Sequence, residues 1–342
     1  MNTKNLNNIQ VNTSDIVMSN FTFYTAPIVT PPKPTASPDS WFTWEGTKIT
    51  GLSNTGKQKN DFVLPAKTTE LGDRVFERNN NIRKFDMTLT NIRKIPYVCF
   101  GASMSLLEVQ LPNSLEIIDH FAFSGCENLR TINNIPSKVK LIGKQAFFQT
   151  GLSSITLNNN LKTIDGSAFQ WCKMLKTINL PNSLIELGSN AFSCSGLTSI
   201  TIPNSISQIN LQTFRECTNL KLVTIPESVA KISQSAFENC FNLTEISIPN
   251  AIEIESFAFK NCDLLSNISL PNSLEIIGQG VFQNCTSLRT ITLPNSIITI
   301  NENAFSILEN NTYKPLPNLK IYVSSERVKQ LVINSGFNLT NN

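Results

Sequence analysis

Two consecutive stretches, LTSITIPNSISQINLQTFRECTN (197–219) and LKLVTIPESVAKISQSAFENCFN (220–242), follow one pattern. Each begins with Leu, passes through Ile-Pro and reaches Phe-x-x-Cys two residues before its end. Equivalent Phe residues recur every 22 to 24 residues, at positions 76, 100, 123, 147, 169, 192, 214, 237, 259, 282 and 305. A fixed period of this length predicts a solenoid in which each repeat forms one turn.

The first half of a repeat has the pattern of a short strand with one buried face. Ile200 and Ile202 are predicted to point into the core, and Ser199 and Thr201 to point outward, because successive strand side chains alternate between the two faces. Pro203 follows where the strand must end, since proline has no N–H to donate to the next ladder bond.

The second half returns the chain to the next turn. A second extended segment is predicted at Ile209 and its equivalents, and Ala-Phe-x-x-Cys suits a single 3₁₀ or α turn. One turn buries about five apolar side chains, worth roughly 1.5–3 kcal/mol each. Ordering its backbone costs at least about 1 kcal/mol for each of its residues. We therefore expect the turns to stack, with the recurring Phe residues in one buried file.

The segments on either side of the repeats have different patterns. Residues 1–40 contain five prolines between Pro27 and Pro38 and predict an arm or linker, either a disordered tail or an arm that becomes ordered on a partner. Residues 41–75 predict an N-terminal β cap that covers the open end with Trp41 and Trp44. The repeats occupy 76–308. Residues 309–342 predict a C-terminal strand-helix cap, with Ser324 or Ser325 at the start of the helix.

Three stretches, LPNSLEIIDHFAFSGC (111–126), LPNSLEIIGQGVFQNC (270–285) and LKIYVSSERVKQL (319–331), resemble the BspA-like class of leucine-rich repeats. The resemblance covers about residues 49–337. It implies an α/β fold, a right-handed leucine-rich-repeat solenoid or horseshoe of about eleven turns, with a parallel β-sheet on one face and short 3₁₀ or helical turns on the other. It also implies non-enzymatic binding and adhesion at a cell surface or outside the cell. Thr150 replaces the repeated Cys and Asn158 the repeated Pro.

The outward strand positions form two columns of small polar side chains on the predicted concave face. They are interpreted either as a ligand-binding surface for a protein or a glycan, or as ordinary solvated strand residues. The candidate binding residues are Glu108, Gln110, Thr131, Asn133, Thr177, Asn179, Ser199, Thr201, Thr224, Glu245, Ser247, Thr290 and Thr292.

Basic residues stand beside these columns, one position after the strand Leu. They predict a loose basic rim for an acidic glycan or protein, or a purely solubilising set: Arg130, Lys176, Lys221, Arg289 and Lys320.

Catalytic, metal-binding and nucleic-acid-binding functions find little support in the sequence. His120, the single histidine, follows Asp119 without a third partner in any known motif, so we expect no catalytic residue. The eight cysteines contain no C-x-x-C pair, so no metal site and no cofactor are expected, and buried free thiols are preferred over disulfides. The net charge of +3 is small, and its basic residues are scattered, which argues against nucleic acid.

The location of the protein is predicted less directly. No run of 18 apolar residues exists, so no membrane insertion is expected. The first twenty residues show no apolar signal-peptide region. A cytoplasmic location is therefore the alternative to the cell surface. The matching alternative function is a structural scaffold or intracellular interaction module docked by its N-terminal arm. Neither the ligand nor the oligomeric state follows from the sequence.

Overall fold

The computed structural model describes residues 33–337. The chain divides into two units, residues 1–35 and 36–342, and all described helices and strands belong to the second. Residues 1–32 of the predicted arm lie outside the described residues.

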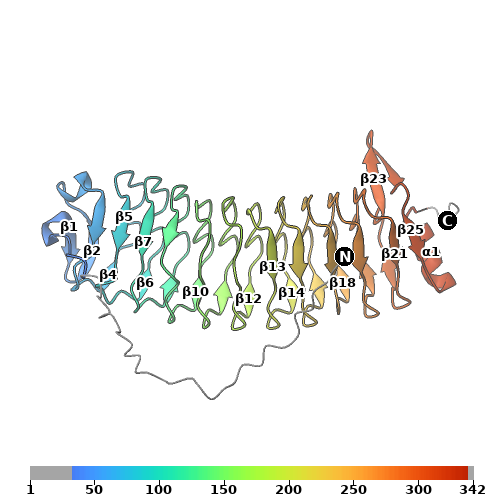
Figure 1. Cartoon of the computed structure of the whole chain (residues 1–342), viewed down its shortest axis with the longest axis horizontal. Coiled ribbons are helices and arrows are strands. Elements are labelled where there is room, and N and C mark those ends of the chain that lie inside the picture. The colour runs from blue at the N-terminus through green and yellow to red at the C-terminus, as the bar shows by residue number, and fades with distance from the viewer. Residues whose placement is uncertain (1–32, 338–342) are drawn as a thin grey trace, which may run out of the picture. The chain divides into compact units, whose positions relative to one another are not determined.

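The second unit is a stack of turns, most of which contribute one strand to a first row of parallel strands (Figure 1). These strands follow the repeated Leu, and their outward side forms what we call the first-strand face. An isolated bridge between Ser154 and Thr177 lies in the gap between β9 and β13. The strands are β3 (Asp61–Val63), β5 (Lys84–Asp86), β7 (Glu108–Gln110), β9 (Thr131–Ile132), β13 (Ser199–Thr201), β15 (Leu222–Thr224), β17 (Glu245–Ser247), β19 (Asn267–Ser269), β21 (Thr290–Thr292) and β25 (Lys320–Tyr322).

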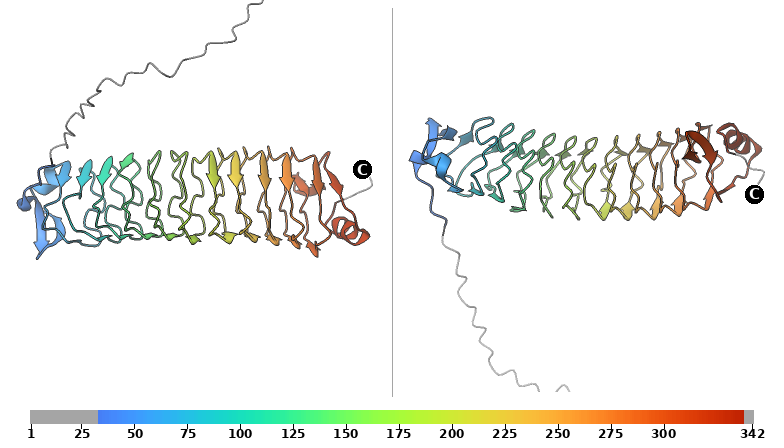
Figure 2. Two further views of the ribbon diagram at one scale, coloured as in Figure 1. Left: turned by 60° about the horizontal axis from the view of Figure 1, so that its bottom comes forward. Right: turned by 90° about the horizontal axis from the view of Figure 1, so that it is seen from above.

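A second row of parallel strands, divided between β12 and β14 into two five-stranded sheets, follows the proline turns, and its outward side is the second-strand face (Figure 2). Its two-residue strands confirm the predicted extended segment at Ile209. They pair side by side from one turn to the next, so that the row follows the length of the stack. The strands are β6 (Lys94–Ile95), β8 (Ile117–Ile118), β10 (Leu141–Ile142), β11 (Thr163–Ile164), β12 (Glu186–Leu187), β14 (Gln208–Ile209), β16 (Lys231–Ile232), β18 (Glu253–Ile254), β20 (Ile276–Ile277) and β22 (Thr299–Ile300).

The third side of each turn holds the Ala-Phe segment. It contains the predicted i→i+3 hydrogen bonds, such as the one from the Cys217 N–H to the Phe214 carbonyl (3.1 Å). These bonds alternate with bonds to the next turn. Gln212 and Glu216 have left-handed backbones, with φ of 54° and 58°, a geometry that costs about 1–2 kcal/mol per residue. Both donate their N–H to the following turn, at 3.1 and 2.8 Å.

The Phe residues form the predicted buried file. From Phe100 to Phe305, successive ring centroids lie 5.2–5.9 Å apart, with the ring planes within 13° of parallel. Beside the file, six cysteines each donate their S–H to a Phe carbonyl of the preceding turn at 3.0–3.2 Å. Ser103 makes the same bond to Phe76 through its hydroxyl, at 2.6 Å.

All eight cysteines are buried free thiols. Burial raises the pKa of the Cys126 and Cys217 thiols to about 12, and that of Cys172 to about 11. The cysteines therefore act as small apolar residues with a weak donor and carry no charge at neutral pH.

The two ends of the stack are covered by different structures. At the N-terminal end, β1 (Phe42–Glu45) and β2 (Lys48–Leu52) form an antiparallel hairpin. The ring of Trp41 meets the buried ring of Phe62 edge-on at 5.9 Å. Two short 3₁₀ segments and one strand complete this end: η1 (Asp39–Trp41), η2 (Gly56–Gln58) and β4 (Glu70–Leu71).

At the C-terminal end, the hairpin of β23 (Ser306–Glu309) and β24 (Thr312–Pro315) extends beyond the row of turns (Figure 1). Helix α1 (Glu326–Asn334) follows β25. The Ser325 hydroxyl accepts from the N–H of Val328, which confirms one of the two predicted capping residues. Val328 and Val332 are fully buried and face the last turn.

Candidate functional site

The first-strand face carries the predicted columns in register. Ser199, Leu222, Glu245 and Asn267 pair in one column, and Thr201, Thr224, Ser247 and Ser269 pair in the other. The stack thus presents similar groups at the inter-strand spacing of about 4.8 Å. Ten of the thirteen candidate residues are exposed, and the three partly buried ones are Glu108, Gln110 and Asn133.

These three side chains have structural partners. Asn133 accepts the Leu111 N–H (2.8 Å) and donates to the Leu111 carbonyl (3.1 Å). The Asn133 side chain therefore makes the two hydrogen bonds that a backbone pair would make if β9 continued. The Gln110 amide donates to Glu108 (3.1 Å), and Glu108 also lies 3.6 Å from the Lys84 ammonium. The part of the face that is free to bind thus lies mainly between β13 and β21.

One residue of the predicted basic rim is in a different position. Lys320 pairs with Thr290, and Tyr322 pairs with Thr292, so Lys320 belongs to the first column and not to the rim. The prediction for Lys320 was wrong because β25 starts one residue earlier relative to its Leu than the other strands do. The remaining four rim residues are exposed.

The second-strand face, which the sequence did not single out, holds several ion pairs between neighbouring turns. Lys231 lies 3.0 Å from Glu253 and 2.6 Å from Glu255, and its hydrogen bonds to Glu255 and Glu253 raise its pKa. Lys94 lies 2.6 Å from Asp119. Burial acts to raise the pKa of Asp119, but the bonds from Lys94 and from the backbone of His120 together lower it.

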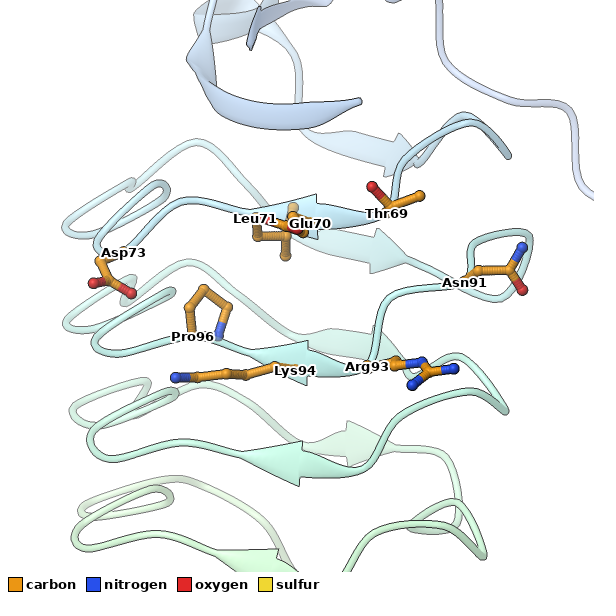
Figure 3. Close-up of a pocket in the computed structure, with 8 residues that line it drawn as sticks. All are labelled: Thr69, Glu70, Leu71, Asp73, Asn91, Arg93, Lys94 and Pro96. Carbon is orange, nitrogen blue, oxygen red and sulfur yellow. The ribbon is translucent and has the colours of Figure 1, made fainter. Parts of the chain in front are cut away.

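A groove of about 630 Å³ opens on this side near the N-terminal end, where the ladder between β4 and β6 is interrupted (Figure 3). Glu70 lies on β4, and Arg93 and Lys94 at β6 point to opposite ends of the groove. Arg93 lies 3.7 Å from Glu116, and Lys94 is held by Asp119. Both basic groups of this groove are therefore already neutralised by acidic neighbours.

The Asp119–His120 pair has a structural role in this arrangement. The Nδ1 atom of His120 accepts the N–H of Lys144 from the next turn at 2.8 Å. Asp119 accepts the N–H of His120 at 2.7 Å and pairs with Lys94. The imidazole nitrogen that a catalytic base would need is thus used to join two turns.

Within residues 33–337, no group of three or more His, Cys, Asp or Glu side chains is arranged to hold a metal ion. None of the described helices has the length and apolar character to cross a membrane.

The sequence matches the family of BspA type leucine rich repeat regions over residues 53–151, 93–220, 140–263 and 252–325. The chain belongs to this family. Its match covers both sheets, the Phe file and nearly all of the first-strand face. No curated protein matches the chain.

Solved structures show the same architecture. A leucine-rich repeat protein from Bacteroides ovatus is 24% identical with a TM-score of 0.58, over 83% of this chain and 88% of that one. One from Eubacterium ventriosum is 22% identical with a TM-score of 0.52, over 78% and 81%. A leucine rich cell surface protein from Faecalibacterium prausnitzii is 23% identical with a TM-score of 0.47, over 90% and 100%. The first two likenesses establish the solenoid fold.

Proposed function

We propose that this BspA-type solenoid is a non-enzymatic binding protein that recognises a protein or glycan through its first-strand face, at a cell or particle surface. The observation that carries the proposal is the pair of in-register columns from β13 to β19. The location rests on the family alone.

The chemistry of the columns suits recognition by close contact. Ser and Thr side chains are short, so a partner can approach the sheet closely, and each hydroxyl both donates and accepts. Leu222, exposed at 49%, and Tyr322, exposed at 53%, add apolar contact area on the same face. Solenoids use extended strand faces of this kind as binding surfaces.

The test introduces a long charged side chain into the columns. Thr201→Arg and Thr224→Arg replace exposed neighbours in register, and Ser207→Arg places the same side chain on an exposed position beyond this face. We expect the first two variants to lose binding in a screen against matrix proteins and glycans, with unchanged melting temperatures. Ser207→Arg should bind as the unmodified protein does.

Two outcomes would contradict the proposal. Equal binding by Thr201→Arg and Ser207→Arg would exclude the first-strand face as the site. Loss of association on deletion of residues 1–40, with no effect of the face variants, would favour the scaffold function. Protease treatment of intact cells tests the location, since a surface protein is degraded and an internal one is protected.

A further inference from the structure

A second groove, of about 640 Å³, lies on the second-strand face in the N-terminal half of the stack. It is formed by Glu116 and Ile117 at β8 and by the turns at 137–141 and 160–162. Its rim carries three exposed lysines, Lys138, Lys140 and Lys162.

The backbone places two of these lysines next to each other. The Lys162 N–H donates to the Lys140 carbonyl at 2.9 Å, and the Lys140 N–H donates to the Glu116 carbonyl at 3.0 Å. The two lysine side chains therefore start about 4.8 Å apart, directly before the paired strands β10 and β11. Glu116, the acidic group of the groove, is nearest to Arg93, at 3.7 Å.

This arrangement departs from the rest of the face. Elsewhere, charged side chains on neighbouring turns have opposite signs and pair, as in Lys231–Glu253 at 3.0 Å. In the described part of the chain, none of the three groove lysines has a carboxylate within 4.0 Å. Like charges directly opposite each other destabilise a sheet, so the fold gains nothing from Lys140 beside Lys162.

Basic residues are also concentrated in the part of the sequence that contains the three groove lysines. Residues 128–185 contain seven basic side chains and one acidic, a net charge of +6 in a chain of net charge +3, so the remaining residues carry −3. The small net charge of the chain thus conceals a basic segment whose groove carries unneutralised ammonium groups. Such a segment attracts polyanions over a distance of about one Debye length, about 8 Å at physiological salt.

We propose that this groove binds an acidic glycan, a linear saccharide bearing sulfate or carboxylate groups. Lysines act as compact point charges, suited to anionic groups repeated along a chain. Ser137 and Asn160 offer polar contacts for hydroxyl groups, and Ile117 and Leu141 are partly buried and give an apolar edge for a sugar ring. No aromatic side chain lines the groove for stacking on bases, as single-stranded nucleic acid would require.

The test uses dextran sulfate, with uncharged dextran as the matched probe and polygalacturonate as the carboxylate form. The triple variant Lys138→Gln, Lys140→Gln, Lys162→Gln is compared with Lys57→Gln, Lys314→Gln, Lys329→Gln, which removes the same charge elsewhere. We expect the groove variant to bind dextran sulfate or polygalacturonate about ten-fold more weakly. Its melting temperature should be equal or higher, because a repulsion is removed.

A variant of opposite sign sharpens the test. Glu116→Gln removes the acidic group of the groove and should strengthen binding about two-fold. Glu227→Gln, at an exposed position on a distant turn, should do so less.

The proposal would be overturned if the protein bound neither dextran sulfate nor polygalacturonate, or if it bound uncharged dextran as tightly as dextran sulfate. It would also be overturned if both triple variants lost the same affinity. Polyglutamate binding as tight as that of the glycans would instead indicate an acidic peptide site and would overturn it as well. None of these results depends on the first-strand face, so Thr201→Arg should bind these glycans normally. Failure here would therefore leave the proposed function untouched.

Discussion

Replacing Phe214 by Ala tests whether the Phe file stabilises the stack. Phe214 is fully buried and lies between Phe192 and Phe237, with ring centroids at 5.9 and 5.4 Å. Loss of the ring opens a cavity of roughly 100 Å³, which at about 24 cal/mol per Å³ costs about 2 kcal/mol. Lost transfer free energy adds about 2 kcal/mol, and two lost ring contacts add up to about 1 kcal/mol. We expect a total loss of about 4–5 kcal/mol.

Urea unfolding followed by circular dichroism measures this change as a shift in the free energy of unfolding. Phe241→Ala is the matched control, because Phe241 is 40% exposed and lies outside the file. It should cost less than about 1 kcal/mol. Hydrogen exchange shows whether the loss is confined to the turns beside residue 214. If Phe214→Ala costs no more than Phe241→Ala, the file does not stabilise the core and the reasoning is refuted.

Three further predictions concern buried and partly buried polar groups. The eight free thiols should resist Ellman's reagent in the folded protein and react in urea, because burial raises the pKa of every one of them; fast reaction of the native protein would contradict this. Burial acts to raise the pKa of Glu238, but bonds from Ser235, Lys260 and Arg215 outweigh it and lower the pKa. The carboxylate therefore stabilises the fold above its unfolded pKa of about 4.3, and this stability is lost as pH falls through the folded pKa. Glu238→Gln should show a smaller drop in melting temperature between pH 6 and about pH 3 than the unmodified protein. Asn133→Ala should lower the free energy of unfolding by about 1–2 kcal/mol through the loss of its two backbone bonds, while Thr131→Ala, an exposed neighbour, should change it by less than about 0.5 kcal/mol.

Much of the fold could be predicted because each repeat has the same pattern of apolar, polar, Pro and Phe positions. The alternation around Ile200 gave the inward and outward residues, and the recurring Phe gave the core file. The register of Lys320 could not be predicted, since it depends on how β25 pairs after the β23–β24 hairpin.

The candidate sites were predictable to a smaller degree. The columns follow from strand alternation, but the role of Asn133 depends on where β9 ends, because its side chain there bonds to the backbone of Leu111. The basic groove arises between turns, from side chains about 22 residues apart in the sequence. The charge run from 128 to 185 was a signal for it, but the total of +3 concealed it.

The left-handed residues of the third side have a consequence for how such a protein can change in length. Their geometry is imposed by hydrogen bonds to the next turn and is adopted by residues as different as Trp171, Gln212 and Ser235. A whole repeat can therefore be gained or lost without a special sequence at the junction. Removing residues 220–242 would bring β13 against β17 in the register that each already uses with β15. The length of the stack, and with it the length of the first-strand face, can thus change in steps of one repeat during evolution.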